Sequence, residues 1–185
     1  MKRTMQWRGI LLAALAGGYA TAASANGSTW MIYDGLTHLD SMRCDSCPGG
    51  ENYSPHDPQS WAYQIDVTHT LGTSSGGYPY GLTAGYLNLG SVDSKKTDGV
   101  YALYHVSGGT TGFRWTGGAG PYLYAVTEQG TGGYVNVYRA GFLMQAGVAY
   151  SRSRKGFEGR LVWERLTTFD SFDQDVFLAG LGKRF

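Results

Sequence analysis

The sequence predicts an all-β protein, an eight-stranded antiparallel transmembrane β-barrel with a cleaved signal peptide. The first reason is composition: 29 of the 185 residues are glycine, 14% are aromatic and only 16% are charged. Glycine at about twice its average usage, with many tyrosines and short turn clusters, is typical of sheets rather than of coiled coils or helical bundles. The other two reasons are an apolar leader at the N-terminus and a regular series of strand-like segments.

The N-terminus has the three parts of a secretory signal peptide. Lys2, Arg3 and Arg8 form a positive start. Residues 9–18 (GILLAALAGG) form a short apolar stretch, and residues 23–25 (Ala-Ser-Ala) offer a small-residue cleavage site. An apolar stretch of this length is too short to cross a bilayer with tilt to spare, so we expect cleavage after the third of these residues.

The predicted organisation is therefore a signal peptide at 1–25 and an outer-membrane β-barrel at 26–185, located in the bacterial outer membrane. Residues 26–185 hold 12 basic and 14 acidic side chains, a formal charge of −2. This balance gives no basic surface for nucleic acid, and no nucleic-acid partner is expected. No later apolar run reaches the roughly 18 residues of a membrane-spanning helix.

Strand-like segments of about ten residues, the length a tilted membrane strand requires, follow the leader. They cover residues 30–39, 61–71, 80–89, 99–106, 116–127, 140–150, 157–166 and 175–185. Eight is an even number, as closure of a bacterial barrel requires. The last segment ends on Phe185 and resembles the final strand of outer-membrane barrels, where a terminal Phe also serves as an assembly signal.

The connecting segments alternate in character. Short or glycine-rich links at 72–79, 107–115 and 151–156 are predicted to face the periplasm. More polar and on average longer links at 40–60, 90–98, 128–139 and 167–174 are predicted to face outside, the first being the longest. Closure of such a sheet removes every edge, which is the condition for a sheet to sit in lipid.

Alternation within the strands assigns the two faces. The expected outward residues include Trp61, Tyr63, Ile65, Val67 and Leu71, then Phe142, Met144, Ala146, Val148 and Tyr150. The opposite, inward face is expected to carry small or apolar residues in four strands: Gly81, Thr83, Gly85, Gly117, Ala119, Leu123, Ala125, Gly141, Leu143, Gly147, Gly180 and Gly182. In the other strands it is expected to carry Asp34, Gln64, Asp66, Glu158, Arg160 and Glu164.

Two interpretations of that inward face stay open. An eight-stranded interior is normally just filled by its own side chains. A side built from glycine leaves either an apolar gap that receives a hydrocarbon chain, or room that larger neighbours backfill. Pro121 interrupts the fifth strand and cannot donate to the ladder, so it marks either a lateral entry point for lipid or a bulge.

Candidate chemistry lies on the predicted outer side. His38 ends the first strand, on the side of the pattern shared with Asp34, and adjacent Asp93 and Ser94 lie in the link after the third strand. An imidazole, a carboxylate and a hydroxyl are the parts that acyl transfer needs, although any long polar loop contains Asp and Ser.

At this point the chain resembles the lipid A palmitoyltransferases of the PagP type, in a divergent branch without the N-terminal amphipathic helix. These are eight-stranded barrels with an essential His in the first outer loop and an Asp-Ser pair in the second, which His38 and Asp93-Ser94 match. The resemblance implies palmitoyl transfer from an outer-leaflet phospholipid to lipid A, without a cofactor or metal, by a monomer.

In that scheme His38 is the general base, Asp93 or Asp34 orients it, and Ser94 contacts the substrate or acts as nucleophile. Lys95 and Lys96 either hold lipid A phosphates or only solubilise the loop. The resemblance also implies an interior acyl slot, for which the floor residues would be Gly117, Gly141 and Gly147, with lateral access at Pro121.

Cys44 and Cys47, the only cysteines, are expected to form a disulfide outside the cytoplasm, closing a small ring in the first outer link. His56 is expected to be a solvated loop residue and His69 an outward-facing residue near the inner end of its strand.

Two other functions compete with acyl transfer. One is a non-enzymatic small barrel of the OmpX or OmpW kind, adhesive or structural, which acts through its loops. The other is a lipid A deacylase, which is disfavoured because its His-x-Ser-Asn motif is missing from the seventh strand. A porin is excluded because eight strands enclose no aqueous channel.

Overall fold

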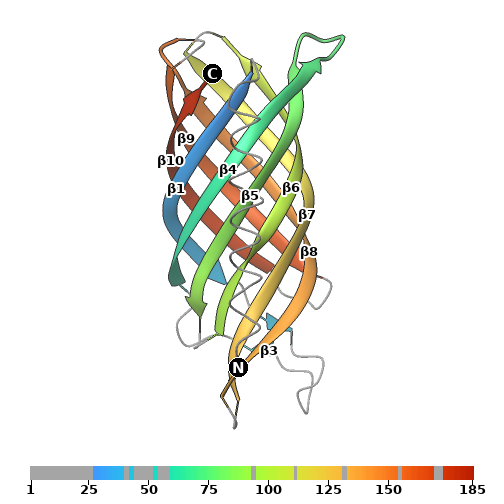
Figure 1. Ribbon diagram of the computed structural model, residues 1–185, viewed down its shortest axis with the longest axis vertical. Helices are drawn as coiled ribbons and strands as arrows, with labels where there is room; N and C mark the ends of the chain where they lie inside the picture. Colours follow the sequence, from blue (N-terminus) through green and yellow to red (C-terminus); the bar gives the residue numbers. More distant parts are fainter. Residues whose placement is uncertain are drawn as a thin grey trace.

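The computed structural model shows a closed antiparallel barrel (Figure 1). It describes residues 27–39, 42–43, 52–53, 59–92, 95–110, 112–130, 133–153, 156–168 and 173–185. The barrel strands are β1 (Ser28–Leu39), β4 (Gln59–Thr73), β5 (Pro79–Val92), β6 (Lys95–Gly109), β7 (Phe113–Gly130), β8 (Gly133–Tyr150), β9 (Gly156–Thr168) and β10 (Asp173–Arg184). Each strand pairs with its neighbours along the chain, and β1 closes the cylinder by pairing with both β4 and β10.

The predicted eight-stranded class is confirmed, and each predicted strand is present. The expected signal peptide at 1–25 lies outside the described residues. In the described part of the chain, no helix is long and apolar enough to span a bilayer.

All four outer links are shorter than predicted, the first by only two residues, because the strands continue past their predicted ends. Residues 93–94 alone separate β5 from β6, and residues 131–132 separate β7 from β8. The pairing of β7 with β8 extends to Gly130 and Gly133, so this hairpin projects beyond the barrel at the lower end of Figure 1. The link between β1 and β4 remains the long one, and within it β2 (Met42–Arg43) pairs with β3 (Asn52–Tyr53).

The inner end of the barrel, at the top of Figure 1, carries short turns. In the turn between β4 and β5, Ser74 and Gly77 donate backbone hydrogen bonds that close a compact loop, at 2.9 Å each. Gly77 has a φ of 83°, a conformation that only glycine adopts without strain. Short turns at one end and a long link at the other match the topology of outer-membrane barrels.

The outward faces predicted for β4 and β8 are confirmed. In β4, Trp61, Tyr63, Ile65 and Leu71 are exposed, and in β8 every second residue from Phe142 to Tyr150 is exposed. An exposed apolar surface of this kind around a closed sheet is what a barrel presents to lipid.

The predicted faces of β7 are wrong. Leu123 is 58% exposed and Tyr122 is fully buried, so Gly117, Ala119, Leu123 and Ala125 belong to the outer wall. The physical reason is size: the large rings of Tyr122 and Tyr124 are buried in the lumen, 5.2 Å apart between centroids, so the small residues that alternate with them face outward.

Asp34 was also expected inside and instead lies on the outward face of β1. The inward positions of this strand are taken by Met31, Tyr33 and Leu39, which are almost completely buried. Because side chains alternate along a strand, these three residues force Asp34 outward, between the register partners Tyr63 and Ala179.

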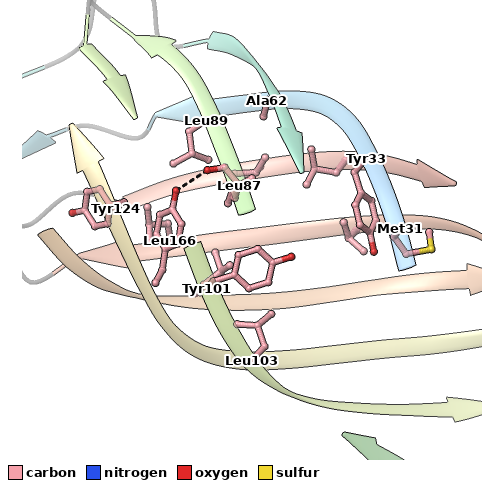
Figure 2. Close-up of a cluster of buried hydrophobic side chains, with 14 of the residues drawn as sticks. Met31, Tyr33, Ala62, Leu87, Leu89, Tyr101, Leu103, Tyr124 and Leu166 are labelled. Carbon is pink, nitrogen blue, oxygen red and sulfur yellow. Dashed lines mark hydrogen bonds between the residues drawn. The ribbon is translucent and has the colours of Figure 1, made fainter. Parts of the chain in front are cut away.

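Apolar side chains fill the outer half of the lumen (Figure 2). Leu87 and Leu89 from β5 meet Tyr124 from β7 and Leu166 from β9, and all four are nearly inaccessible. The hydroxyl of Tyr122 donates to the backbone carbonyl of Leu87 at 3.1 Å. The outer half of the cylinder is therefore a packed core rather than a channel.

Polar groups fill the middle and the inner half. Near the middle, Gln64 donates to the Tyr101 hydroxyl at 2.7 Å and to Asp66 at 3.2 Å. Closer to the inner end, Glu158 pairs with both Arg160, at 2.6 Å, and Arg114. Buried charges persist where they are paired and hydrogen-bonded, as this ion triad is.

The glycines of the inner face are covered by larger neighbours. Tyr33 lies opposite Gly180, Tyr101 opposite Gly85 and Met31 opposite Gly182 in the strand register. A Cβ atom at any of these glycines would collide with the facing side chain. Of the two interpretations left open by the sequence, the described lumen matches backfilling by larger residues.

We predict that Gly180→Val destabilises the barrel by about 1–3 kcal/mol, because the new side chain overlaps the Tyr33 ring. The measurement is urea unfolding in phospholipid vesicles. Gly117→Val is the matched control, since a Cβ atom there meets only the Gln145 carbonyl oxygen at 3.7 Å. Equal stability of the two variants would contradict the packed lumen.

We predict that Glu158→Gln destabilises the barrel by about 3–5 kcal/mol, because it leaves Arg160 and Arg114 in the lumen without their counterion. Asp173→Asn is the control, since its ion pair with Arg165 is partly exposed and is worth about 1 kcal/mol or less. The same unfolding assay compares the two variants. Similar losses of stability would contradict a larger contribution from the buried triad.

Candidate functional site

His38 stands at the outer end of β1, where the sequence placed it. In the register it lies opposite Asp175 of β10 on one side and Gln59 of β4 on the other. Its side chain is half-buried and shares the outward face with Asp34, four residues earlier. The imidazole therefore lies at the rim of the outer wall and not over the lumen.

Asp175 belongs to a polar cluster on the same outer wall, spanning β9 and β10. Arg165 donates to Asp175 at 3.1 Å and to Asp173 at 3.0 Å, and the Trp163 indole N–H donates to Asp175 at 2.9 Å. We call His38, Trp163, Arg165, Asp173 and Asp175 the outer-rim cluster. Its two carboxylates are held by donors, so the cluster anchors this side of the barrel at the polar edge of the membrane.

A second polar group lies across the rim, on β4, β5 and β6. The Tyr86 hydroxyl donates to Asp98 at 2.9 Å, and Asn88 donates to the Tyr63 hydroxyl at 3.4 Å. The Tyr63 and Tyr86 rings lie 6.0 Å apart. Tyrosines with apolar bodies and hydrogen-bonded tips are typical of the interfacial girdle of membrane barrels.

The structure describes only part of the catalytic set that the resemblance implies. Asp93 and Ser94 lie outside the described residues, as do Cys44, Cys47 and His56. Lys95 is placed at the start of β6, but its side chain is outside the described part. Lys96 is exposed at the outer end of β6. Pairing of His38 with an Asp-Ser dyad thus stays a prediction.

The residues expected to line an acyl slot do not share one face. Gly117 and Pro121 lie on the outer wall, whereas Gly141 and Gly147 face the lumen. Around Gly141 and Gly147 the space belongs to Leu166, Tyr124 and Val162, with Leu166 3.1 Å and Val162 2.7 Å from where the respective Cβ atoms would lie. The predicted floor is therefore corrected: Gly117 faces lipid, as does Pro121 at the predicted access point, and Gly141 and Gly147 lie beneath packed side chains.

Pro121 was expected to mark a lateral entry or a bulge. The ladder between β6 and β7 passes from Tyr101–Tyr122 to Tyr104–Ala119 in one register, so no bulge forms here. A Cβ atom at the preceding Gly120 would collide with the backbone carbonyl of Ala102, which shows how closely β6 approaches at this point.

The other histidines are placed as follows. His69 is on the outer wall near the inner end of β4, as predicted, and its Nδ1 atom is 3.1 Å from the Ser28 hydroxyl. His105 is 5% exposed and faces the lumen, and its Nδ1 atom has no hydrogen-bond partner in the described residues.

Sequence reasoning missed the outer-rim cluster apart from His38. Arg165, Asp173 and Asp175 sit at or next to the predicted ends of the last two strands, where alternation was not followed outward. Continuing the outward pattern Leu161–Trp163 by two residues reaches Arg165, and stepping back from Phe177 reaches Asp175. The two-residue alternation of side chains along a strand would therefore have placed Arg165 and Asp175 on the outward face.

A groove of about 450 Å³ lies on the outer wall nearer the inner end. It crosses β8, β9 and β10, with Val148, Leu161, Ala179 and Leu181 among its lining residues. Gly159 forms part of its floor, because a residue without a side chain leaves the wall indented there.

No family model matches the chain, and no curated protein matches it. Solved structures do resemble it. The Neisserial surface protein A (NspA) aligns with a TM-score of 0.59 at 11% identity, over 86% of this chain and 100% of that one. The N-terminal β-barrel domain of Pseudomonas aeruginosa OprF aligns with a TM-score of 0.56 at 15% identity, over 86% and 98%.

Ail of Yersinia pestis, the attachment invasion locus protein solved with the heparin analogue sucrose octasulfate, aligns with a TM-score of 0.52 at 13% identity, over 86% and 99%. At these identities the likeness shows the fold alone. Together with the apolar outer wall and the edge-free sheet, it confirms the expected place of the chain in the bacterial outer membrane.

We predict that Asp34→Leu raises the free energy of unfolding by up to about 2 kcal/mol, because an exposed carboxylate on the lipid-facing wall is costly. Ile32→Leu, two residues away on the same face, is the neutral control. Unfolding in vesicles provides the measurement. A loss of stability in Asp34→Leu would mean that the carboxylate is held by a favourable contact.

Proposed function

We propose that this protein is a non-enzymatic small outer-membrane barrel of the OmpX or OmpW kind, and that the surface at its outer end carries its function. The observation that supports this most is the filled lumen. Tyr33, Tyr101 and Met31 cover the inner glycines, and the Arg114–Glu158–Arg160 triad occupies the inner half. A barrel filled in this way is a scaffold for what its ends present.

The outer end offers the surface that such a scaffold presents. The longest link, residues 40–58, joins β1 to β4 and contains the small β2–β3 pair. The β7–β8 hairpin extends as far as Gly130 and Gly133. Binding residues commonly lie on loops that a rigid sheet positions, and here the closed barrel is the rigid part.

Lipid A palmitoyl transfer is the second candidate, favoured by one observation. His38 lies opposite Asp175 at the outer end, and a carboxylate beside an imidazole suits a general base. Against it, Asp175 already accepts hydrogen bonds from Arg165 and Trp163, and the glycines proposed as an acyl floor lie on opposite faces or beneath side chains. A phospholipid donor and a lipid A acceptor belong to this candidate alone.

Mass spectrometry of lipid A, from cells with and without the gene, separates the candidates. We expect an unchanged lipid A profile for a non-enzymatic barrel. A palmitoyl increment that appears with the protein and vanishes in His38→Ala would overturn the proposal in favour of the transferase. Loss of an acyl chain would overturn it in favour of a deacylase.

A second experiment directly tests the surface at the outer end of the barrel. Residues 44–50 are replaced by a Gly-Ser sequence of equal length, and attachment of bacteria carrying either form to host cells and matrix is counted. We expect attachment to fall with the replacement, while Ala84→Leu on the lipid-facing wall leaves it unchanged. Folding is checked by the heat-dependent gel shift of the barrel, and unchanged attachment by the folded replacement would contradict an adhesive role.

A further inference from the structure

The groove on the outer wall has a defined shape. Its floor includes Gly159 of β9 and Ala179 of β10, and its walls include Val148, Leu161 and Leu181. Phe113 of β7 and Tyr150 of β8 line one side of the groove near the inner turns, and their rings lie 4.9 Å apart between centroids. A Cβ atom at Gly159 would have only Leu181 at 3.8 Å and a backbone oxygen at 4.0 Å near it, so the indentation is open.

Two cations lie just beyond the lining residues, at the inner ends of the strands that form the groove. Lys183 follows Leu181 by two residues on the same face of β10, and Arg152 is exposed in the turn between β8 and β9. The Lys183 ammonium lies 5.2 Å from the centre of the Phe185 ring, which supports it without neutralising it. In the part of the chain that the structure describes, no carboxylate pairs with Lys183 or Arg152.

The strand register indicates how deep in the membrane the groove and its two cations lie. Lys183 lies opposite Trp30 on one side and Phe157 on the other, and Gly159 lies opposite Leu181. Phe157, Phe113 and Tyr150 are exposed aromatics at the inner end of the wall. Aromatics at strand ends mark the membrane–water interface, so the two cations stand at the headgroup layer of the inner leaflet and the groove opens into the hydrocarbon next to it.

We propose that this groove binds a glycerophospholipid of the inner leaflet, and that an anionic headgroup is preferred. One acyl chain lies in the indentation at Gly159, and the phosphate is held between Lys183 and Arg152. Charge complementarity commits the site to this occupant: an apolar slot with two cations beyond its inner end, neither paired with a carboxylate of the described residues, fits an acyl chain that ends at a phosphate. The site lies at the end of the barrel opposite the outer surface and does not depend on it.

Native mass spectrometry of the full barrel in mild detergent tests the proposal, with phosphatidylglycerol and phosphatidylethanolamine as probes. We expect one retained phosphatidylglycerol per barrel and weaker retention of phosphatidylethanolamine. In Lys183→Gln/Arg152→Gln, we expect the preference for phosphatidylglycerol to fall at least tenfold, since two phosphate contacts are lost. In Gly159→Leu, we expect retention of both lipids to fall because the slot is filled.

Matched controls separate this site from general lipid coating. Lys96→Gln removes a cation at the outer end, and Ala84→Leu adds bulk to the wall of β5, far around the barrel. Both are expected to retain phosphatidylglycerol as the unaltered protein does. Unchanged preference in the folded double variant, or equal loss in the controls, would overturn the proposal. If Gly159→Leu fails the heat-dependent gel shift, the double variant alone decides.

Discussion

The constraint on which the structure depends is that a sheet in hydrocarbon must pair every backbone N–H and C=O group within itself. Pairing of β1 with both β4 and β10 meets this condition by closing the sheet. Closure with eight strands then fixes how much space the lumen offers. Glycines and tyrosines of the inner face both follow from that volume, because several large lumen side chains take the space that a facing glycine leaves, as Tyr33 does opposite Gly180.

The same volume explains why the lumen is divided along its length. Toward the outer end, leucines and tyrosines pack against one another, and Leu87, Leu166 and Leu143 are completely buried. Toward the inner end, where Arg114 lies in the first turn-side residues of β7, charged groups retain partners in the Glu158 triad. A buried charge is stable there only as part of a network, whereas an apolar plug needs no partners. The apolar core closes the outer half of the lumen, and the ion triad joins β7 to β9 in the inner half.

Alternation and length alone predicted the strands, the closure and the wall of β4 and β8, because those strands carry large apolar residues at every second position. Alternation gave the wrong face in β7, because the residues of its outer wall are small and would fit on either face. It also gave the wrong face for Asp34, whose charge suggested the lumen. In both places the face is decided by which residue fills the lumen: Tyr122 takes an inward place in β7, and Tyr33 takes the inward place beside Asp34. The outer-rim cluster was not predicted, because Asp175 and Arg165 come together only through the register of β9 and β10.

Two cations at opposite rims of the outer wall, Arg165 and Lys183, differ in how their charges are satisfied. At the outer end, Arg165 is neutralised by Asp173 and Asp175, so this cation contributes structure rather than attraction for a ligand. At the inner end, Lys183 has an aromatic ring beside it and no carboxylate from the described residues. A phosphate gains little from a cation that is already paired, and more from one that is not, where the medium is less polar than water. Lys96 at the outer end is also exposed, so an exposed cation alone does not make a lipid site. What supports the proposed phospholipid site at the inner end is that Lys183 follows the apolar groove on the same face of β10.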